Sequence, residues 1–131
     1  MRNIIVLPYD DNWAIEFEKI KSELQAALMG SETSIEHVGS TSIKGMYAKP
    51  IIDIDVVIEN DMFDTVRDRL KSIGYVHVGD LGITSREAFD YKGKNHLMEH
   101  HLYVCPKDSP ELKRHIMFRD YLRLNETDRD R

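Results

Sequence analysis

The sequence predicts one α/β (α+β) domain built on a mixed β-sheet with flanking helices. Apolar residues recur at three- and four-residue intervals over residues 11–29, and again before Gly74, which is the pattern of amphipathic helices. Short β-branched runs over residues 34–38 and 49–58 lie between these helices and are typical of strands. Because strands first alternate with helices and then follow one another, a mixed sheet is favoured.

The first half of the chain is expected to alternate strands and helices. Pro8 ends a short extended arm, and Asp10 or Asp11 can cap the helix that follows. Gly30 stops that helix. The expected elements are an arm over residues 4–7, a helix over 11–29, a strand over 34–38, a brief helix after it, a strand over 49–58 and a helix over 60–72 capped at 60–61.

The second half is expected to complete the sheet and to end in a helix. Pro106 ends the sheet, Asp108 or Ser109 caps the last helix, and Pro110 occupies its first turn. The expected elements are a strand over residues 75–78, a hairpin of strands over 88–91 and 97–104 joined across 92–95, and a helix that carries Leu112, Ile116, Phe118, Tyr121 and Leu122. We therefore assign residues 1–124 to one domain and residues 125–131 to a frayed polar tail.

Size, charge and cysteine content narrow the class of protein. A chain of 131 residues buries about two thirds of its unfolded surface and needs no covalent staple. Cys105 is the single cysteine, which excludes an internal disulfide and a Cys-x-x-Cys site and fits a reducing compartment. No apolar run is long enough for a signal peptide or a membrane span, so a cytoplasmic protein without a membrane partner is expected. A formal charge of −5 gives no basic footprint for duplex DNA.

A turn suited to phosphate follows the strand over residues 34–38. Gly39 lets the backbone adopt conformations closed to other residues, and Ser40, Thr41 and Ser42 add hydroxyls and exposed amides at a helix start. The spacing matches neither a Walker loop nor a dinucleotide fingerprint. Ordinary helix capping is therefore the alternative explanation of this turn.

Two aspartates lie two positions apart on the next strand. Side chains alternate along a strand, so Asp53 and Asp55 point to the same face with Cβ atoms roughly 7 Å apart. At an effective dielectric constant of about 20 their repulsion is about 3 kcal/mol, which favours a bound cation. The apolar residues of this strand occupy its other face, so the aspartates are expected to face a cleft. The alternative is an exposed strand end with ion pairs to Lys44 and Lys49.

A glycine-serine turn beside paired carboxylates is an arrangement that suits nucleotidyl transfer. Hard carboxylate oxygens bind Mg²⁺ or Mn²⁺, while turn amides and a lysine orient the phosphates of a nucleoside triphosphate. Lys44, Lys49 and Arg86 can supply a small local basic patch. Arg119 is the best arginine of the last helix for a phosphate contact, with an exposed ion pair to Asp120 or Glu111 as the alternative.

A zinc site is the competing interpretation of the residues near the end of the sheet. His96, His100, His101 and Cys105 supply the nitrogen and sulfur ligands that zinc prefers. Residues 97–104 are expected to form a strand, on which His100 and His101 face opposite sides. We therefore favour solvated or core histidines over a structural zinc ion, and a buried or idle thiol at Cys105.

Four segments of the chain together match the pattern of a known family. They are residues 37–43, 49–54, 100–104 and 118–122, which span most of the chain. On these segments the chain resembles the GrpB family, a group of small proteins with the polymerase-beta-like nucleotidyltransferase fold. By this resemblance Gly39 and Ser40 match the glycine-serine turn of the superfamily, and Asp53 and Asp55 match its metal-binding pair. The family tends to continue with another helix, so part of the cleft wall or a dimer surface is expected to be missing here.

The resemblance also implies a third metal ligand from a later strand. The corresponding residues are Glu99, His101 and Tyr103, which alternate onto one face, so that Glu99 or His101 can complete the site. We favour His101. The resulting assignments are catalytic roles for Asp53, Asp55 and His101, metal binding by Asp53, Asp55 and Glu99, and nucleotide or phosphate binding by Gly39, Ser40, Thr41, Lys49, Arg86 and Arg119.

The function expected from these assignments is Mg²⁺-dependent transfer of a nucleotidyl group from a nucleoside triphosphate to an unidentified acceptor. A nucleotide-sensing or partner-binding module that keeps the fold without turnover is the alternative. A structural domain whose aspartates merely form salt bridges is a third hypothesis. The sequence leaves open the acceptor, the preferred base and whether the protein forms a homodimer.

Overall fold

The computed structural model describes residues 5–83 and 85–125 of the chain. Within these residues, helices and strands alternate first and the remaining strands follow. The elements are α1 (Asn12–Ala27), β1 (Thr33–Val38), the 3₁₀ turn η1 (Ser40–Ser42), β2 (Ile52–Ile58), the 3₁₀ turn η2 (Asn60–Met62), α2 (Phe63–Lys71), β3 (Tyr75–Gly79), β4 (Glu87–Tyr91), β5 (His100–Pro106) and α3 (Pro110–Leu124).

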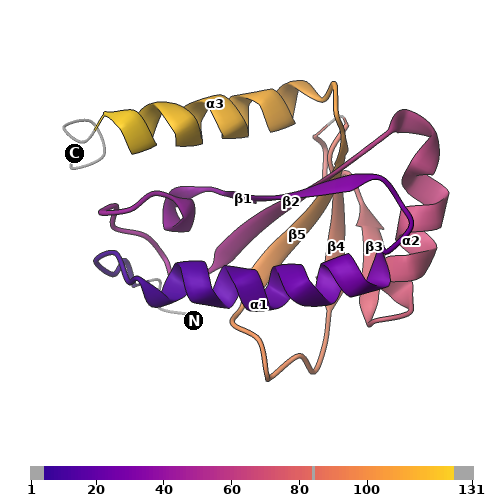
Figure 1. Ribbon diagram of the computed structural model, residues 1–131, viewed down its shortest axis with the longest axis horizontal. Coiled ribbons are helices and arrows are strands. Elements are labelled where there is room, and N and C mark those ends of the chain that lie inside the picture. The colour runs from indigo at the N-terminus through magenta and orange to yellow at the C-terminus, as the bar shows by residue number, and fades with distance from the viewer. Residues whose placement is uncertain (1–4, 84, 126–131) are drawn as a thin grey trace.

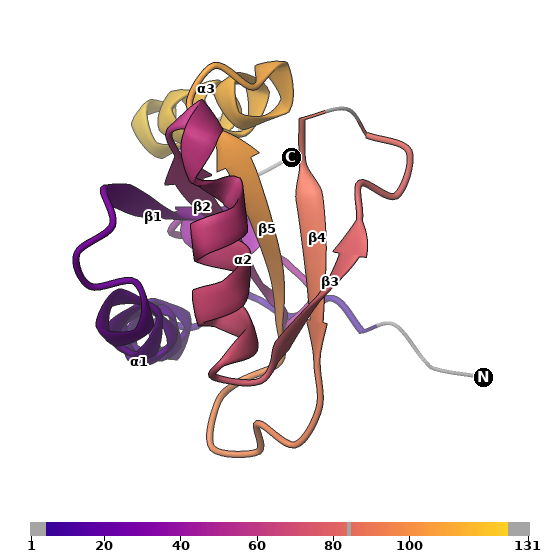
Figure 2. The same ribbon diagram turned by 90° about the vertical axis from the view of Figure 1, so that its right-hand side faces the viewer.

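The five strands form one mixed sheet in the order β1-β2-β5-β4-β3 (Figure 2). β2 and β5 run parallel, whereas β1 is antiparallel to β2, and β4 is antiparallel to both β3 and β5. The predicted mixed sheet is therefore confirmed. Its strand order has a direct consequence for the site, because Asp53 on β2 lies between Val38 on β1 and His101 on β5.

An apolar core fills one face of the sheet, beneath α1 and α2 (Figure 1). In α1, four residues recur at intervals of four, three and four positions, which places them on one side of the helix. Each of them is at most 7% exposed. They are Trp13, Phe17, Ile20 and Leu24. Alternate residues of β2 face this layer, and all of them are buried. They are Ile52, Ile54, Val56 and Ile58.

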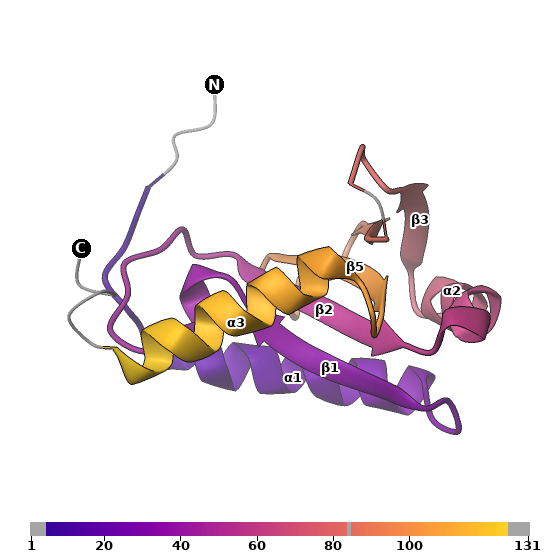
Figure 3. The same cartoon turned by 90° about the horizontal axis from the view of Figure 1, so that it is seen from above.

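The third helix, α3, lies across the opposite face, over β1 and β2 (Figures 1 and 3). Its start follows the predicted signal, since the Ser109 hydroxyl accepts a hydrogen bond of 3.3 Å from the Leu112 amide and Pro110 occupies the first turn. Leu112 and Leu122 are its buried apolar residues. Among the described residues, no helix is long and apolar enough to cross a lipid bilayer.

Several element boundaries differ from the prediction. β5 begins at His100 rather than at residue 97, because the Leu97 amide closes a turn on the Lys94 carbonyl at 3.1 Å. Residues 60–61 belong to the turn η2, and no side chain caps α2. Asp11 makes no capping hydrogen bond at α1, although an Asp10 oxygen accepts one of 2.8 Å from the Asn12 amide.

The described residues include only part of the predicted N-terminal arm and C-terminal tail. In the N-terminal arm, Leu7 forms an isolated antiparallel bridge with Ala48, whereas residue 4 lies outside the described residues. Asn125 follows α3, and the rest of the expected tail, residues 126–131, also lies outside them. The bridge matters for the site because it brings the arm next to the segment between η1 and β2.

Candidate functional site

The predicted turn and the first aspartate meet at the end of β1. Gly39 has φ = 75°, in the left-handed region that favours glycine, and it leads into η1. A Cβ atom at this position would lie 2.5 Å from Oδ2 of Asp53. Any other residue at position 39 would therefore collide with the Asp53 carboxylate. This close approach gives Gly39 a reason beyond ordinary helix capping.

A pocket of about 390 Å³ opens beside this turn. It brings together five of the residues that the sequence assigned to the site, from η1, from the following segment and from two neighbouring strands. They are Ser40, Thr41, Lys49, Asp53 and His101. Tyr47 forms part of the wall and is 65% exposed. The pocket thus combines hydroxyls, a cation, a carboxylate and an imidazole within one small volume.

Asp53 is paired with His101 across the parallel strands. The two residues are register partners, and Nδ1 of His101 lies 3.1 Å from Oδ1 of Asp53. This hydrogen bond, with a smaller electrostatic contribution from the same carboxylate, raises the pKa of His101 above its ordinary value, although burial opposes it. The side chains remain 35% and 51% exposed, so both are accessible to a ligand.

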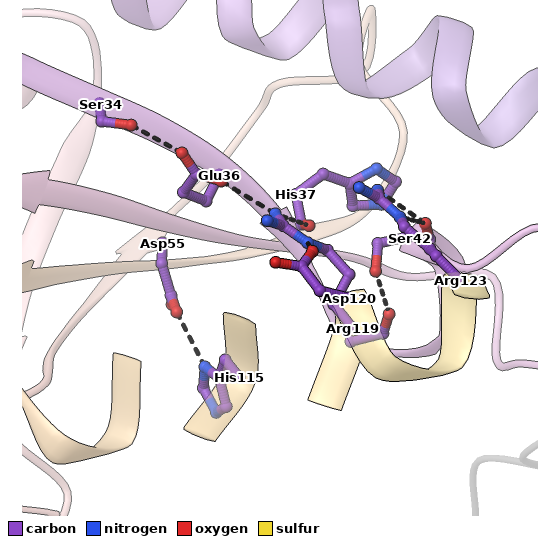
Figure 4. A network of polar contacts seen from close by, with 10 residues as sticks. Ser34, Glu36, His37, Ser42, Asp55, His115, Arg119, Asp120 and Arg123 are labelled. Atoms are coloured by element: carbon purple, nitrogen blue, oxygen red, sulfur yellow. Dashed lines mark hydrogen bonds and ion pairs between the residues drawn. The ribbon is translucent and has the colours of Figure 1, made fainter. Parts of the chain in front are cut away.

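Asp55 lies on the same face but is fully buried beneath α3 (Figure 4). Nδ1 of His115, on α3, donates to Oδ2 of Asp55 at 2.8 Å. The other oxygen, Oδ1, has no hydrogen-bond partner among the described residues. The expectation that both aspartates face an open cleft is therefore wrong for Asp55, because α3 packs on that half of the strand.

His115 connects Asp55 to a second acid. Its Nε2 atom lies 3.6 Å from Oε1 of Glu111, one helical turn earlier in α3. The hydrogen bond to Asp55 raises the pKa of His115, while burial and the nearby Arg86 oppose this shift. The imidazole is therefore held between two carboxylates and carries positive charge more readily than an isolated histidine.

Two arginines fasten α3 to the edge of the sheet and to the turn (Figure 4). Nη1 of Arg119 donates to Glu36 at 2.9 Å and to the His37 carbonyl at 3.1 Å. Arg123 donates from Nε and Nη2 to the Ser42 carbonyl at 3.0 and 2.9 Å. Burial alone would raise the pKa of Glu36, but hydrogen bonds from Ser34 and Arg119 lower it, so this ion pair is maintained at neutral pH.

Besides Gly39 and Asp55, three residues assigned by sequence lie outside the pocket lining. Arg119 is engaged by Glu36 and also pairs with Asp120 at 2.9 Å, which matches the ion-pair alternative considered for it. Arg86 stacks over the Tyr103 ring, with 4.0 Å between the guanidinium carbon and the ring centroid. Glu99 is exposed and precedes β5. The lysine pairs proposed for the aspartates are replaced in the structure by the two histidine pairs.

The residues of the zinc alternative make separate contacts. His100 is buried, and its Nε2 atom lies 2.7 Å from the Tyr75 hydroxyl. His96 pairs with Glu23 at 2.6 Å. Burial raises the pKa of the Cys105 thiol to about 12, which disfavours a thiolate. Across residues 5–83 and 85–125, no group of three or more histidine, cysteine, aspartate or glutamate side chains is arranged to hold a metal ion.

Sequence reasoning missed two residues of this face, His115 and Glu36. His115 lies 60 positions from Asp55 along the chain. Glu36 precedes the turn by three residues and is the register partner of Asp55. Alternation along β1 would have placed Glu36 on the aspartate face, whereas no local pattern indicates where α3 docks.

Comparison with known proteins agrees with this fold. The family model described as GrpB protein matches residues 3–131. The chain belongs to the GrpB family. It is 33% identical over 125 residues to the UPF0157 protein YqkA of Bacillus subtilis, covering 95% of this chain and 36% of YqkA. The chain thus spans about one third of the length of that relative.

Solved structures support the same assignment. The crystal structure of conserved protein GrpB from Enterococcus faecalis superposes with a TM-score of 0.78 at 34% identity, covering 94% of this chain and 74% of that one. The Cid1 poly(U) polymerase superposes with a TM-score of 0.65 at 11% identity, covering 95% of this chain and 41% of Cid1. The fold is therefore that of the polymerase-beta-like nucleotidyltransferases.

One further likeness concerns only part of the chain. A segment of 74 residues is 31% identical to part of the Dephospho-CoA kinase of Mycobacterium tuberculosis. It covers 53% of this chain and 18% of that enzyme.

Proposed function

We propose that the pocket beside Gly39 binds a nucleoside triphosphate together with Mg²⁺ or Mn²⁺, and that the protein transfers the nucleotidyl group to an acceptor. The observation that carries this proposal is the close approach of the Asp53 carboxylate to Gly39, where an added Cβ atom would lie 2.5 Å from Oδ2. The turn to which we assign phosphate binding and the carboxylate to which we assign metal binding thus lie side by side, on a fold that nucleotidyltransferases share.

The residues of the pocket divide into two roles. The amides of the turn after Gly39 and the Ser40 and Thr41 hydroxyls can donate hydrogen bonds to phosphate oxygens, and Lys49 can neutralise their charge. His101 holds Asp53 in place and can exchange a proton at its ring nitrogen. It is the residue of this pocket best suited to receive the proton of an acceptor hydroxyl.

The carboxylates of Asp53 and Asp55 are suitable ligands for a divalent cation. Asp53 and Asp55 offer hard oxygen ligands, and Oδ1 of the buried Asp55 lacks a partner among the described residues. Such an ion would stabilise the negative charge that develops on the phosphoryl oxygens. Asp55 is fully buried beneath α3, so α3 must shift for both aspartates to serve one ligand.

Metal-dependent nucleotide binding tests the assignment directly. We expect Asp53→Asn to weaken Mn²⁺-dependent binding of ATP by at least about tenfold in calorimetry, because it removes the accessible charged ligand. Asp61→Asn removes an exposed acid of η2 and is the matched control, with no change expected. Unchanged metal and nucleotide affinity in Asp53→Asn, with the fold intact, would show that the roles are assigned wrongly.

A nucleotide-sensing or partner-binding module without turnover is the second candidate, and the burial of Asp55 favours it. A pair of accessible carboxylates is needed to hold the ions of transfer, and here His115 engages one of them. Release of pyrophosphate from each of the four labelled triphosphates, with candidate acceptors present, separates the two functions. A binding module is stabilised thermally by nucleotide yet releases no pyrophosphate.

The proposal also includes a class of acceptor for the nucleotidyl group. Partial likeness to a Dephospho-CoA kinase favours a phosphorylated coenzyme precursor as the first class of acceptor to test. Dephospho-CoA is therefore the first compound to include in the pyrophosphate assay, with a nucleoside such as adenosine as a control that lacks the phosphate groups. Equal turnover with both compounds would count against this class.

A further inference from the structure

A second pocket lies on the other side of the turn η1. Thr41 lines both pockets, so the 3₁₀ turn forms a wall shared between them. The second pocket has a volume of about 440 Å³, large enough for a small anionic molecule. The residues that the argument uses are Tyr9, His37, Thr41, Lys44 and Arg123.

The lining of this second pocket is cationic. Lys44 comes from the segment after η1 and Arg123 from the last turn of α3, so two separate elements direct positive charge to one place. Among the described residues that line it, none is acidic. Asp10 and Asp11 act on Tyr9 electrostatically, and Asp120 and Glu36 act on Arg123, but none of these four acids is part of the lining. A lining that has two cations and, among the described residues, no carboxylate favours a negatively charged ligand.

The second pocket also offers neutral hydrogen-bonding groups. Burial, reinforced by Arg123 and Arg119, lowers the pKa of His37 to about 4, so its imidazole is neutral at pH 7. That imidazole lies 2.9 Å from the Thr41 hydroxyl through Nε2 and stacks on Phe17, with 4.6 Å between ring centroids. Burial raises the pKa of Tyr9, whose hydroxyl therefore keeps its proton as a donor.

The cation from α3 is held in position before any ligand binds. Two hydrogen bonds from Arg123 to the Ser42 carbonyl fix the orientation of the planar guanidinium group. Arg119, one helical turn earlier, ties the same helix to Glu36 and the His37 carbonyl. A preorganised guanidinium loses little conformational entropy when it binds an anion.

From this combination we infer that the pocket between Lys44 and Arg123 is a second anion site, which binds a phosphate monoester. The site is distinct from the nucleotide pocket, with which it shares only Thr41. Because Thr41 separates the two pockets, the second site places the phosphate of another molecule beside the nucleotide. The statement that this molecule is the acceptor rests on the proposed function, whereas anion binding itself does not.

Titration of the ¹⁵N-labelled protein with methyl phosphate, and separately with inorganic phosphate, tests the site without metal or nucleotide. We expect saturable shifts of the amides of Tyr9, Lys44 and Arg123. Lys44→Gln should weaken binding by about fivefold, because one charge-assisted contact is lost at a partly exposed site. Lys49→Gln is the matched control, since it removes an exposed lysine of the same segment from the other pocket. The affinity for methyl phosphate read from the amides of Tyr9 and Lys44 should stay within about twofold of wild type in this variant.

Three results would overturn the inference. The first is the absence of saturable shifts at Tyr9 and Lys44, and the second is a loss of affinity in Lys49→Gln but not in Lys44→Gln. The third is tighter binding of inorganic phosphate with no measurable binding of methyl phosphate, which would make the site one for the free ion. Arg123→Gln, checked for an unchanged melting temperature, gives a second variant that should also weaken binding.

The same spectra test the second anion site and the proposed nucleotide pocket independently of each other. Mn²⁺ broadens signals near its own site, so ATP is titrated with Mg²⁺, and the amides of Ser40, Lys49 and Asp53 report on the nucleotide pocket. Shifts at these residues without any at Tyr9 and Lys44 under methyl phosphate would leave the nucleotide proposal standing and reject the second site. The opposite result would support the second site and reject the nucleotide proposal.

Discussion

The two faces of the sheet are stabilised by different interactions. Beneath α1 and α2, β2 contributes Ile52, Ile54, Val56 and Ile58 to a closed apolar core. On the opposite face, which α3 covers in part, the same strand contributes Asp53 and Asp55, which are paired with histidines. Alternation along one strand thus separates the layer that stabilises the fold from the layer that carries reactive groups.

The difference extends to the helices. Four large residues of α1 are at most 7% exposed and face the core. α3 is fastened largely by polar contacts, while four large apolar residues on its outer side are between 54% and 85% exposed. They are Met117, Phe118, Tyr121 and Leu124. A helix held by specific hydrogen bonds can shift at lower cost than one buried in an apolar core, which is the property that access to Asp55 requires.

The largest effect is expected from truncation of the apolar face. Ile54 is fully buried at the centre of β2, so Ile54→Ala removes methyl groups and leaves a cavity. We expect the free energy of unfolding to fall by about 3–4 kcal/mol in urea titration. Ile15→Ala, at a position of α1 that is 58% exposed, is the control and should change it by less than about 0.5 kcal/mol. Similar losses in both variants would contradict the assignment of the core.

On the polar face, His115→Ala should produce the next largest change. It leaves the buried Asp55 carboxylate without its partner, which is expected to cost about 2–3 kcal/mol. In an Asp55→Asn background the same substitution should cost at least about 1 kcal/mol less, because the stranded charge is gone. Arg114→Ala removes an exposed cation of the same helix that pairs with Glu111, and it should have little effect. Additive losses in the double variant would show that the pair is not coupled.

The two faces should also respond oppositely to pH. The pKa of His37 is lowered to about 4 in the folded protein, so its contribution to stability is complete above about pH 6.5 and is lost as the pH falls toward 4. The pKa of His115 is raised, so its contribution is present below about pH 6.5 and is lost as the pH rises through the folded value.

The loss of stability that His37 causes on acidification can be measured with a single variant. Between pH 7.5 and pH 5, wild type should lose about 2 kcal/mol more stability than His37→Gln. His96→Gln, at a histidine whose side chain is 60% exposed, is the control and should follow wild type closely. If His37→Gln loses as much stability on acidification as wild type, the imidazole is not held neutral by its surroundings.

The smallest effect is expected on the outer side of α3. Phe118→Ser removes a ring that is 54% exposed, so the free energy of unfolding should change by less than about 0.5 kcal/mol. Leu112→Ser, at a buried position of the same helix, is the contrasting variant and should cost several-fold more. A loss of several kcal/mol in Phe118→Ser would show that this side of α3 is covered in solution.

Local patterns predicted most of the helices and strands well. The spacing of Trp13, Phe17, Ile20 and Leu24 predicted α1 because a helix and its core contact share one period. The capping signal at Ser109 predicted the start of α3, and the hydroxyl makes the expected hydrogen bond. The predicted start of a strand was wrong where the chain is held by contacts between residues farther apart in sequence. The start of β5 is the example, because the His100 amide donates a hydrogen bond to the Tyr91 hydroxyl at 3.0 Å.

The order of residues along the chain was enough to establish most helices and strands, the glycine turn and the shared face of two aspartates, since all three depend on neighbours a few positions apart. It could not establish that Asp53 stays open while Asp55 is closed. That distinction arises where α3 docks, because His115, 60 positions along the chain from Asp55, contacts it there and α3 removes it from solvent. A contact between segments so far apart depends on how the layers pack in space, which no local pattern encodes.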